Sequence, residues 1–252
     1  MKIDFGLPHQ IPALKRLWKE TFGDSDGFID GFFTTAYAPS RCRCVTVDGE
    51  VAAALYWFDV SCEGQRMAYI YAVATAAAYR GQGLCRALMA DTNAHLALRG
   101  YRGALLVPEG EDLRRMYRSF GYETATTLRE FDCTAGDDLA SIHRVSRERF
   151  AQLRQDLLPQ GAVLQEEENL LYLEKQVNFY AGPGFVAALR RDGDRIFCPE
   201  ILGNSGMAPG ILRALGASQG IFRCPGQGEA FAMFLPLHKK AVTPRYFAFA
   251  FD

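Results

Sequence analysis

The chain has 252 residues, of which 49% are hydrophobic and 23% charged, as in an ordinary globular protein. Lysine and arginine number 28 against 29 acidic residues, so no overall positive charge is available to attract nucleic acid or an anionic membrane. The longest charge-free runs are shorter than the ~20 residues that cross a bilayer, and the N-terminus has an acid, Asp4, where a signal peptide needs apolar residues. We expect a soluble cytoplasmic protein with neither nucleic acid nor a membrane as partner.

The cysteines and histidines follow no metal-binding pattern. The seven cysteines are odd in number, no two of them have the C-x-x-C spacing, and the four histidines are scattered. We therefore expect reduced thiols that mostly fill the core, and no metal site.

The first half of the chain alternates helix and strand patterns. Asp48-Gly49 is a strong two-residue hairpin turn between strand-like runs, and Gly100 follows a helical pattern where glycine commonly ends a helix. In chain order, the patterns predict helices at 8–20 and 26–37, strands at 42–47, 51–62 and 67–75, a helix at 83–99, a strand at 101–107, a helix at 111–120 and a strand at 122–131.

The second half repeats this order. Residues 132–138, with a glycine and several acids, indicate a boundary. The patterns beyond it predict helices at 146–158 and 166–180, strands at 185–190 and 195–202, a helix at 208–215, and strands at 220–224, 230–235 and 246–251. We predict an α+β chain of two domains, 1–131 and 132–252, each a mixed, mainly antiparallel sheet flanked by helices.

One segment, Tyr71 to Leu88, carries a chemical signal because it runs from a strand through a glycine-containing turn into a helix. The first N–H groups of a helix have no partner within it and carry partial positive charge, so they suit a phosphate. Gly81 and Gly83 let the backbone approach an anion closely. The segment has neither the third glycine of a dinucleotide-binding fingerprint nor the Gly-Lys-Ser/Thr of a P-loop. On glycine spacing alone, an ordinary strand-to-helix turn remains open.

The residues around the glycines add a resemblance. Tyr79-Arg80-Gly81-Gln82-Gly83-Leu84 resembles the acetyl-coenzyme A loop of the GNAT superfamily of N-acetyltransferases, although Cys85 occupies the last small position. The stretch 116–122, Met-Tyr-Arg-Ser-Phe-Gly-Tyr, is similar to the family's second block. An asparagine usual in the family seven residues before the tyrosine is Gly110 here. The resemblance covers residues 1–131.

This resemblance implies a cofactor site and a proton donor. Tyr117 would lie near the thioester sulfur of acetyl-coenzyme A and donate a proton or a hydrogen bond to the departing thiolate. The backbone of one strand would pair with the pantetheine arm, and the turn after it would hold the pyrophosphate. The residues concerned are Val73, Ala74 and Thr75 for the strand, and Arg80, Gly81, Gln82, Gly83, Leu84 and Cys85 for the turn.

The general base is not evident. Many members of the family place a glutamate on the fourth strand, but residues 67–79 contain no carboxylate. Glu109 is the nearest acid beyond the fifth strand, and an acid at a helix start is its simpler interpretation. The chain also resembles tandem acetyltransferases related to the enhanced intracellular survival proteins, in which the C-terminal carboxyl enters the active site. By that resemblance, the carboxylate of Asp252 is the candidate base.

The sequence thus predicts an acetyl-coenzyme A-dependent N-acetyltransferase in which an amine attacks the thioester directly. The acceptor is expected to be a small-molecule or peptide amine, and a homodimer is compatible with the sequence. The second half has no counterpart of residues 80–83, so we expect a degenerate domain there. Two alternatives stay open: transfer of another acyl group or to another acceptor, and a non-catalytic coenzyme A-binding or regulatory module.

Overall fold

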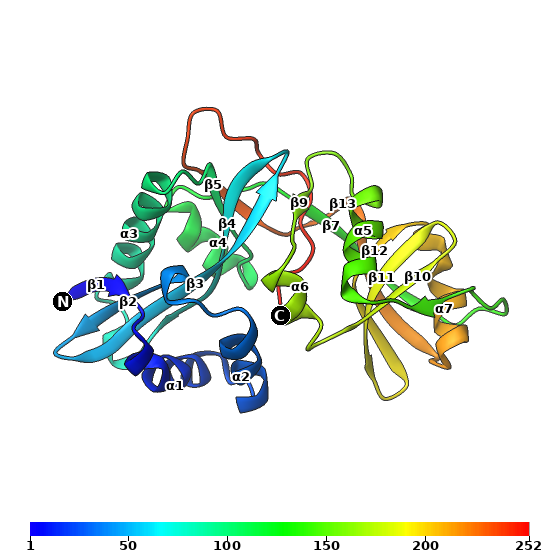
Figure 1. Ribbon diagram of the computed structural model, residues 1–252, viewed down its shortest axis with the longest axis horizontal. Helices are drawn as coiled ribbons and strands as arrows, with labels where there is room; N and C mark the ends of the chain where they lie inside the picture. The colour runs from blue at the N-terminus through cyan, green and yellow to red at the C-terminus, as the bar shows by residue number, and fades with distance from the viewer. Residues whose placement is uncertain (252) are drawn as a thin grey trace. The chain divides into compact units, whose positions relative to one another are not determined.

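The protein is described from a computed structural model that covers residues 1–251. It consists of two compact units, each with its own sheet (Figure 1). Unit 1 comprises Met1–Thr124 together with Met233–Thr243, and unit 2 comprises Ala125–Ala232 together with the described residues from Pro244 onward. The first continuous segment of unit 1 therefore ends at residue 124 rather than at the predicted 131. A second segment, Met233–Thr243, also belongs to this unit.

Unit 1 contains a mixed sheet with strand order β1-β2-β3-β4-β5-β14-β6. All neighbouring strands are antiparallel except β4 and β5, which are parallel and joined through helix α3. The elements are β1 (Lys2–Phe5), α1 (Ile11–Phe22), α2 (Asp26–Thr35), β2 (Cys42–Val47), β3 (Glu50–Cys62), β4 (Gln65–Thr75), α3 (Leu84–Leu98), β5 (Gly103–Leu106), α4 (Gly110–Arg118), β6 (Glu123–Thr124) and β14 (Met233–Pro236), with short 3-10 turns at Pro8–Gln10, Pro39–Arg41 and Ala77–Tyr79.

Strand β3 shows how the sheet separates two cores. Successive side chains of a strand point to opposite faces. Leu55 and Trp57 therefore enter the core cluster that also contains Leu88 of α3. Tyr56 instead contacts Trp18 of α1, with ring centroids 5.4 Å apart. Helices α1 and α2 consequently cover one face of the sheet, and α3 and α4 cover the other (Figure 1).

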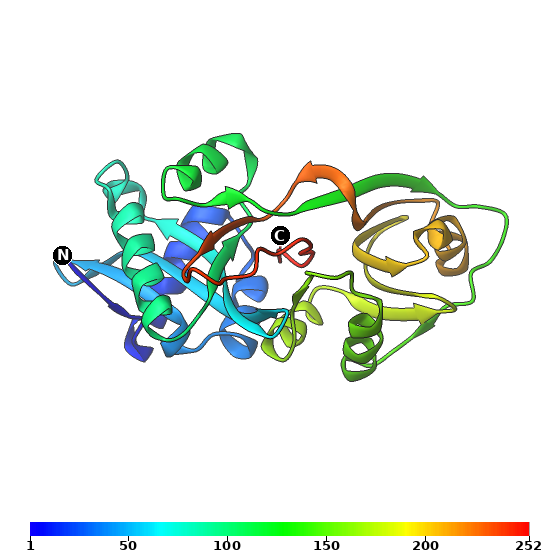
Figure 2. The ribbon, with the colours of Figure 1, turned by 90° about the horizontal axis from the view of Figure 1, so that it is seen from above.

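Strand β14 was predicted as part of the second domain, and this prediction is wrong. Residues 233–236 lie between β5 and β6 in unit 1, where Met233 pairs with both Leu106 and Thr124. Figure 2 shows this strand, near the red end of the colour scale, among the blue and green elements of unit 1. Met233 is fully buried in the core cluster. Gly103 leaves room for the ring of Phe234, because a Cβ at Gly103 would lie 2.1 Å from that ring.

Unit 2 has a six-stranded sheet of order β7-β13-β12-β11-β10-β8. Its strands β12 and β13 are parallel and joined through α7, as β4 and β5 are joined through α3 in unit 1. The elements are β7 (Thr127–Thr134), β8 (His143–Arg144), α5 (Arg147–Leu157), β9 (Val163–Leu164), α6 (Glu168–Leu173), β10 (Asn178–Gly182), β11 (Phe185–Asp192), β12 (Arg195–Gly203), α7 (Ala208–Leu215) and β13 (Gln219–Ala230). The two-domain α+β prediction is confirmed, although β7, predicted as the end of the first domain, belongs to unit 2.

Two other predicted elements differ in unit 2. The helix expected over 166–180 ends at Leu173, and strand β10 begins at Asn178. Residues 246–251, expected to form a strand, do not form one. Their backbone makes isolated hydrogen bonds instead of the regular series that joins neighbouring strands. Gln165 donates from Nε2 to the carbonyl of Phe249 (2.9 Å) and accepts from its N–H (3.3 Å). The hydroxyl of Tyr246 donates to Glu200, 3.0 Å away.

Candidate functional site

The two parallel strands of unit 1 separate along their length. Strand β4 pairs with β5 only from Met67 to Tyr69, and β5 ends at Leu106. From Ile70 to Thr75, no strand of the described chain pairs with this edge of β4. On this edge, the backbone groups of Val73 and the N–H of Thr75 could therefore pair with an extended ligand that binds as an added strand.

A bulge marks the place where the strands part. Tyr56 of β3 pairs with Tyr71, and Ala54 pairs with Ala74, so β4 has one more residue than β3 between these two pairs. Ala72 has a φ of 48°, in the left-handed region that costs a non-glycine residue about 1–2 kcal/mol. Strained backbone of this kind gathers at functional sites, where surrounding structure maintains it.

The three strand residues predicted to bind pantetheine do not face the same way. Ala74 pairs with β3, and the N–H of Ala76 donates to the carbonyl of Ala52 at 2.9 Å. Because antiparallel pairs alternate in direction, the backbone groups of Thr75, and of Val73 two residues earlier, point to the open edge. The structure thus places the backbone groups of Val73 and Thr75 at the open edge of β4, whereas those of Ala74 point toward β3.

The turn that follows β4 presents unpaired N–H groups to solvent. No described residue accepts a hydrogen bond from a backbone N–H of residues 81–86. Gly81 and Gly83 have φ values of 76° and 78°, and a Cβ added at either would meet no atom within 4 Å. The turn is exposed from Arg80 to Gly83. Together with the first turn of the fifteen-residue helix α3, it forms a cradle for an anion. We call residues 80–86 the cradle.

The side chains of the cradle hold it in place. Arg80 donates from Nε to the carbonyl of Thr75 (3.1 Å), and Gln82 donates from Nε2 to the carbonyl of Ala78 (3.2 Å). Leu84 is buried in the core beneath the turn. Burial raises the pKa of the Cys85 thiol, so the thiol is uncharged at neutral pH and does not repel a phosphate.

Tyr117 lies in the same core cluster as Leu84 and the partly buried Cys85. It is the buried residue of α4, and its ring contacts those of Phe120 and Tyr122 at centroid distances of 5.9 and 6.1 Å. Burial raises the pKa of Tyr117 far above its ordinary value, with smaller contributions from Cys85 and Tyr122. The phenol therefore remains protonated at every physiological pH and can act as a hydrogen-bond donor.

Buried tyrosines also predict how stability depends on pH. Their pKa values are raised above the unfolded value of about 10, chiefly by burial, and that of Tyr101 is raised to about 12. The stability that these protonated phenols contribute is fully present below pH ~10 and is lost as the pH rises through the folded pKa. Each residue lowers the free energy of unfolding by at most about 1.4 kcal/mol per pH unit. The residues are Tyr56, Tyr101, Tyr117, Tyr122 and Tyr246.

Burial also raises the pKa of several thiols, whose ordinary value is about 8.5, so we expect urea denaturation midpoints to begin to fall above pH ~8.5 and to fall more steeply above pH ~10. The substitution Tyr122→Phe should make this fall less steep, because Tyr122 is fully buried and its hydroxyl bonds only to Asn93 (2.9 Å) among the described residues. Equal midpoints at pH 8 and 11 would contradict the assignment.

The structure supplies no carboxylate on the open edge of β4 within the described chain. Tyr71 lies there, just beyond Tyr69, which still pairs with β5, and both tyrosines belong to an aromatic cluster with Phe58. Glu109 is exposed at the start of α4 and makes no side-chain capping bond. Asp252 lies outside the described residues, so its role stays a prediction. Over residues 1–251, no three His, Cys, Asp or Glu residues gather closely enough to hold a metal ion.

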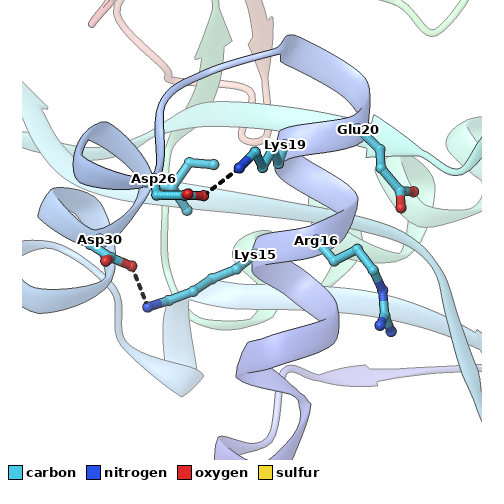
Figure 3. A pocket seen from close by; sticks show the side chains of 7 residues that line it. Lys15, Arg16, Lys19, Glu20, Asp26 and Asp30 are labelled. Atoms are coloured by element: carbon cyan, nitrogen blue, oxygen red, sulfur yellow. Dashed lines mark hydrogen bonds and ion pairs between the residues drawn. The ribbon is translucent and has the colours of Figure 1, made fainter.

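A separate groove lies between α1 and α2. It has a volume of about 320 Å³ and is bridged by Lys15–Asp30 and Lys19–Asp26 ion pairs of 2.6 and 2.8 Å (Figure 3). Arg16 and Glu20 also line it, so its three basic and three acidic side chains balance in charge. Neither the predicted cradle residues nor Tyr117 line this groove, and its balanced charge gives an anion no net attraction.

The corresponding turn of unit 2 offers fewer free N–H groups than the cradle. The side chain of Asn204 accepts the N–H of Gly206 at 3.1 Å, and Pro209 in the first turn of α7 has no N–H. These contacts support the expectation that unit 2 has no phosphate-binding turn of its own.

Comparison with known proteins agrees with this arrangement. Residues 7–125 match the model of a family described as Acetyltransferase (GNAT) domain. A GCN5-related N-acetyltransferase from Anabaena variabilis is 18% identical, with a TM-score of 0.74 over 94% of this chain and 73% of that one. A putative acetyltransferase from Pyrococcus horikoshii is 13% identical, with a TM-score of 0.67 over 98% of this chain and 93% of that one. No curated protein matches the sequence.

The structural likeness defines the class of fold: a tandem of GNAT-like units. The family match then adds that residues 7–125 match a GNAT acetyltransferase domain. Eis1 from Mycobacterium abscessus has the same fold at 14% identity, with a TM-score of 0.68 over 94% of this chain and 74% of that one. Among the described helices, none has both the length and the apolar character that a membrane span requires.

Proposed function

We propose that unit 1 binds acetyl-coenzyme A and transfers the acetyl group to an amine by direct attack on the thioester. The observation that carries this proposal is the continuity of two features: the edge of β4 at Val73 and Thr75, beyond its pairing with β5, and the cradle, whose N–H groups from Gly81 to Arg86 have no acceptor among the described residues. An extended pantetheine arm needs the first feature, and a diphosphate needs the second.

The cradle supplies much of the binding free energy in this proposal. Each hydrogen bond from a backbone N–H to a charged phosphate oxygen contributes roughly 1.5–3 kcal/mol. The residues proposed to make these bonds are Gly81, Gln82, Gly83, Leu84 and Cys85. The N–H of Arg80 donates to the carbonyl of Ala77 (3.3 Å), so Arg80 is proposed to contribute the positive charge of its side chain instead. Thr75 and Val73 contribute backbone hydrogen bonds to the pantetheine arm, while Ala74 holds the strand against β3.

Tyr117 is the proposed hydrogen-bond donor to the departing thiolate. A thiol has an ordinary pKa of about 8.5, and the raised pKa of Tyr117 makes complete proton transfer to the thiolate uphill. Its phenol therefore acts by stabilising the developing charge, as donors in an oxyanion hole do. An acceptor amine of pKa ~10.4 must lose a proton first, which costs roughly 4.6 kcal/mol at pH 7. Asp252 is the proposed base for that step, with Glu109 as the alternative.

A second function has one observation in its favour. Residues 67–79 contain no carboxylate, and the strand carries Tyr69 and Tyr71 there, whose rings pack against Phe58. A module that binds coenzyme A without catalysing transfer needs the cradle but no base. Both functions use the same cofactor site, but only the acetyltransferase releases free coenzyme A when an amine is present.

Two measurements separate these possibilities. A rise in Tm with acetyl-coenzyme A, absent with acetyl-pantetheine, reports binding through the diphosphate. A thiol-release assay over a panel of small amines, amino acids and peptide N-termini then reports transfer. Binding without release from any amine would support the non-catalytic module, and no shift in Tm would contradict both functions.

Tyr117→Phe tests the assigned donor. We expect kcat to fall about 10²-fold with little change in the Kd of acetyl-coenzyme A, because the ring remains and only the hydroxyl is removed. Tyr101→Phe is the matched control, since its hydroxyl bonds to Asp59, far along the sheet from the cradle, and kcat should not change. Equal kcat for Tyr117→Phe and wild type would remove Tyr117 from the mechanism.

A further inference from the structure

Arg86 takes part in two structures at once. It is the third residue of α3, and its backbone N–H is one of the unpaired groups of the cradle. Its guanidinium turns away to the end of α4, where Nη1 donates to the carbonyl of Ser119 (3.0 Å) and Nη2 donates to the hydroxyl of Ser119 (2.9 Å). One residue thus connects the start of α3 with the end of α4.

The positive charge of Arg86 is electrostatically favourable at the C-terminal end of α4. The last carbonyls of a helix lack partners and carry partial negative charge, so a cation is favourable there. Ser119 directs its own hydroxyl to the carbonyl of Met116, 2.7 Å away, and so extends the same hydrogen-bonded end. The guanidinium also lies over the ring of Phe120, 4.5 Å from its centroid.

Helix α4 is held to the core through a narrow apolar face. Tyr117 is the buried residue of this helix, and the remaining side chains are exposed or partly buried. The ring of Tyr117 meets that of Phe120 edge-on, at an interplanar angle of 90°. Because the guanidinium of Arg86 covers Phe120, its loss would free both the helix end and the ring against which Tyr117 packs.

We propose that Arg86 is a positioning residue that sets the phenol of Tyr117 relative to the cradle. The proposal rests on the proposed function of the site. The backbone N–H of Arg86 binds the diphosphate in this proposal, and its side chain holds α4, the helix that carries Tyr117. The acceptor of the guanidinium is therefore Ser119 and not a cofactor phosphate.

A double-mutant cycle tests this coupling. Arg86→Gln keeps the backbone N–H, so the KM for acetyl-coenzyme A should change less than about threefold, while kcat falls about tenfold. In a Tyr117→Phe background, the same substitution should lower kcat by no more than about twofold, because the group that Arg86 positions has been removed. Arg86→Lys, which retains one donor for Ser119, should recover part of the loss. A tenfold fall in both backgrounds would overturn the proposal.

A spectroscopic readout keeps the inference independent of turnover. With 3-fluorotyrosine incorporated, the ¹⁹F signal of residue 117 is identified by its absence in Tyr117→Phe. In the ligand-free protein, Arg86→Gln should shift or broaden this signal. Arg115→Gln, which removes an arginine of α4 that pairs with Asp112 on the exposed face, should leave it unchanged. An unchanged signal in Arg86→Gln would overturn the positioning role, whereas absence of transfer in wild type would overturn only the proposed function.

Discussion

Replacing Gly81 and Gly83 together with alanine is expected to weaken acetyl-coenzyme A binding by about 30-fold or more. That factor corresponds to about 2 kcal/mol, the loss of one or two hydrogen bonds to charged oxygens. Both residues have left-handed φ values, which cost alanine about 1 kcal/mol or more each. The added methyl groups meet no protein atom, so they project into open space at the turn, where a ligand would have to approach. Titration calorimetry with acetyl-coenzyme A measures the effect.

The control is a second pair of glycines with the same backbone geometry. Gly49 and Gly64 lie in hairpin turns of unit 1, at φ values of 88° and 73°, and a Cβ at either also meets nothing within 4 Å. Replacing both with alanine should reduce the free energy of unfolding about as much as the cradle pair does, without changing affinity. Equal affinity in the two double variants would contradict a diphosphate site at the cradle.

A fragment that ends at residue 131, where the sequence predicts the first domain to end, is expected not to fold. It lacks β14, which lies between β5 and β6 and carries the fully buried Met233. Loss of one large buried side chain alone costs about 2–5 kcal/mol, comparable with the total stability of many domains. Circular dichroism during heating should show no cooperative transition.

The matched control is a shortened chain in which residue 124 is joined directly to residue 233. Thr124 and Met233 are paired neighbours on adjacent antiparallel strands, so a two-residue Asn-Gly turn can connect them as a hairpin. The chain 1–124–Asn-Gly–233–243 should therefore unfold cooperatively. A cooperative transition for fragment 1–131, or none for the joined chain, would contradict the observed division of the chain.

Much of the local structure could be predicted because it depends on neighbouring residues. The turn at Asp48-Gly49 and the strand before it at 42–47 follow from turn chemistry and β-branched or apolar side chains, and both are found. Helix α7 has the predicted bounds, 208–215. The family resemblance, drawn from short motifs at 79–84 and 116–122, is confirmed by the match over residues 7–125.

Other features have no local signal. Nothing in the sequence around Ala72 marks a bulge, because alanine is not a residue that favours a left-handed φ. The proposed positioning residue, Arg86, lies just beyond the cradle glycines, and its partner Ser119 is distant in sequence. An arginine at a helix start is indistinguishable from a solvated one until the fold brings α4 beside it.

The sequence by itself determined the type of most long elements, the two-fold repetition of the pattern and the position of the glycine-containing turn before α3, because periodicity, glycine placement and helix starts act over a few residues. Only the tertiary structure decided which sheet the strands 127–134 and 233–236 join. Either strand could satisfy its backbone groups in either sheet, so the choice depends on long-range side-chain packing, such as Met233 in the core of unit 1 and Phe234 against Gly103.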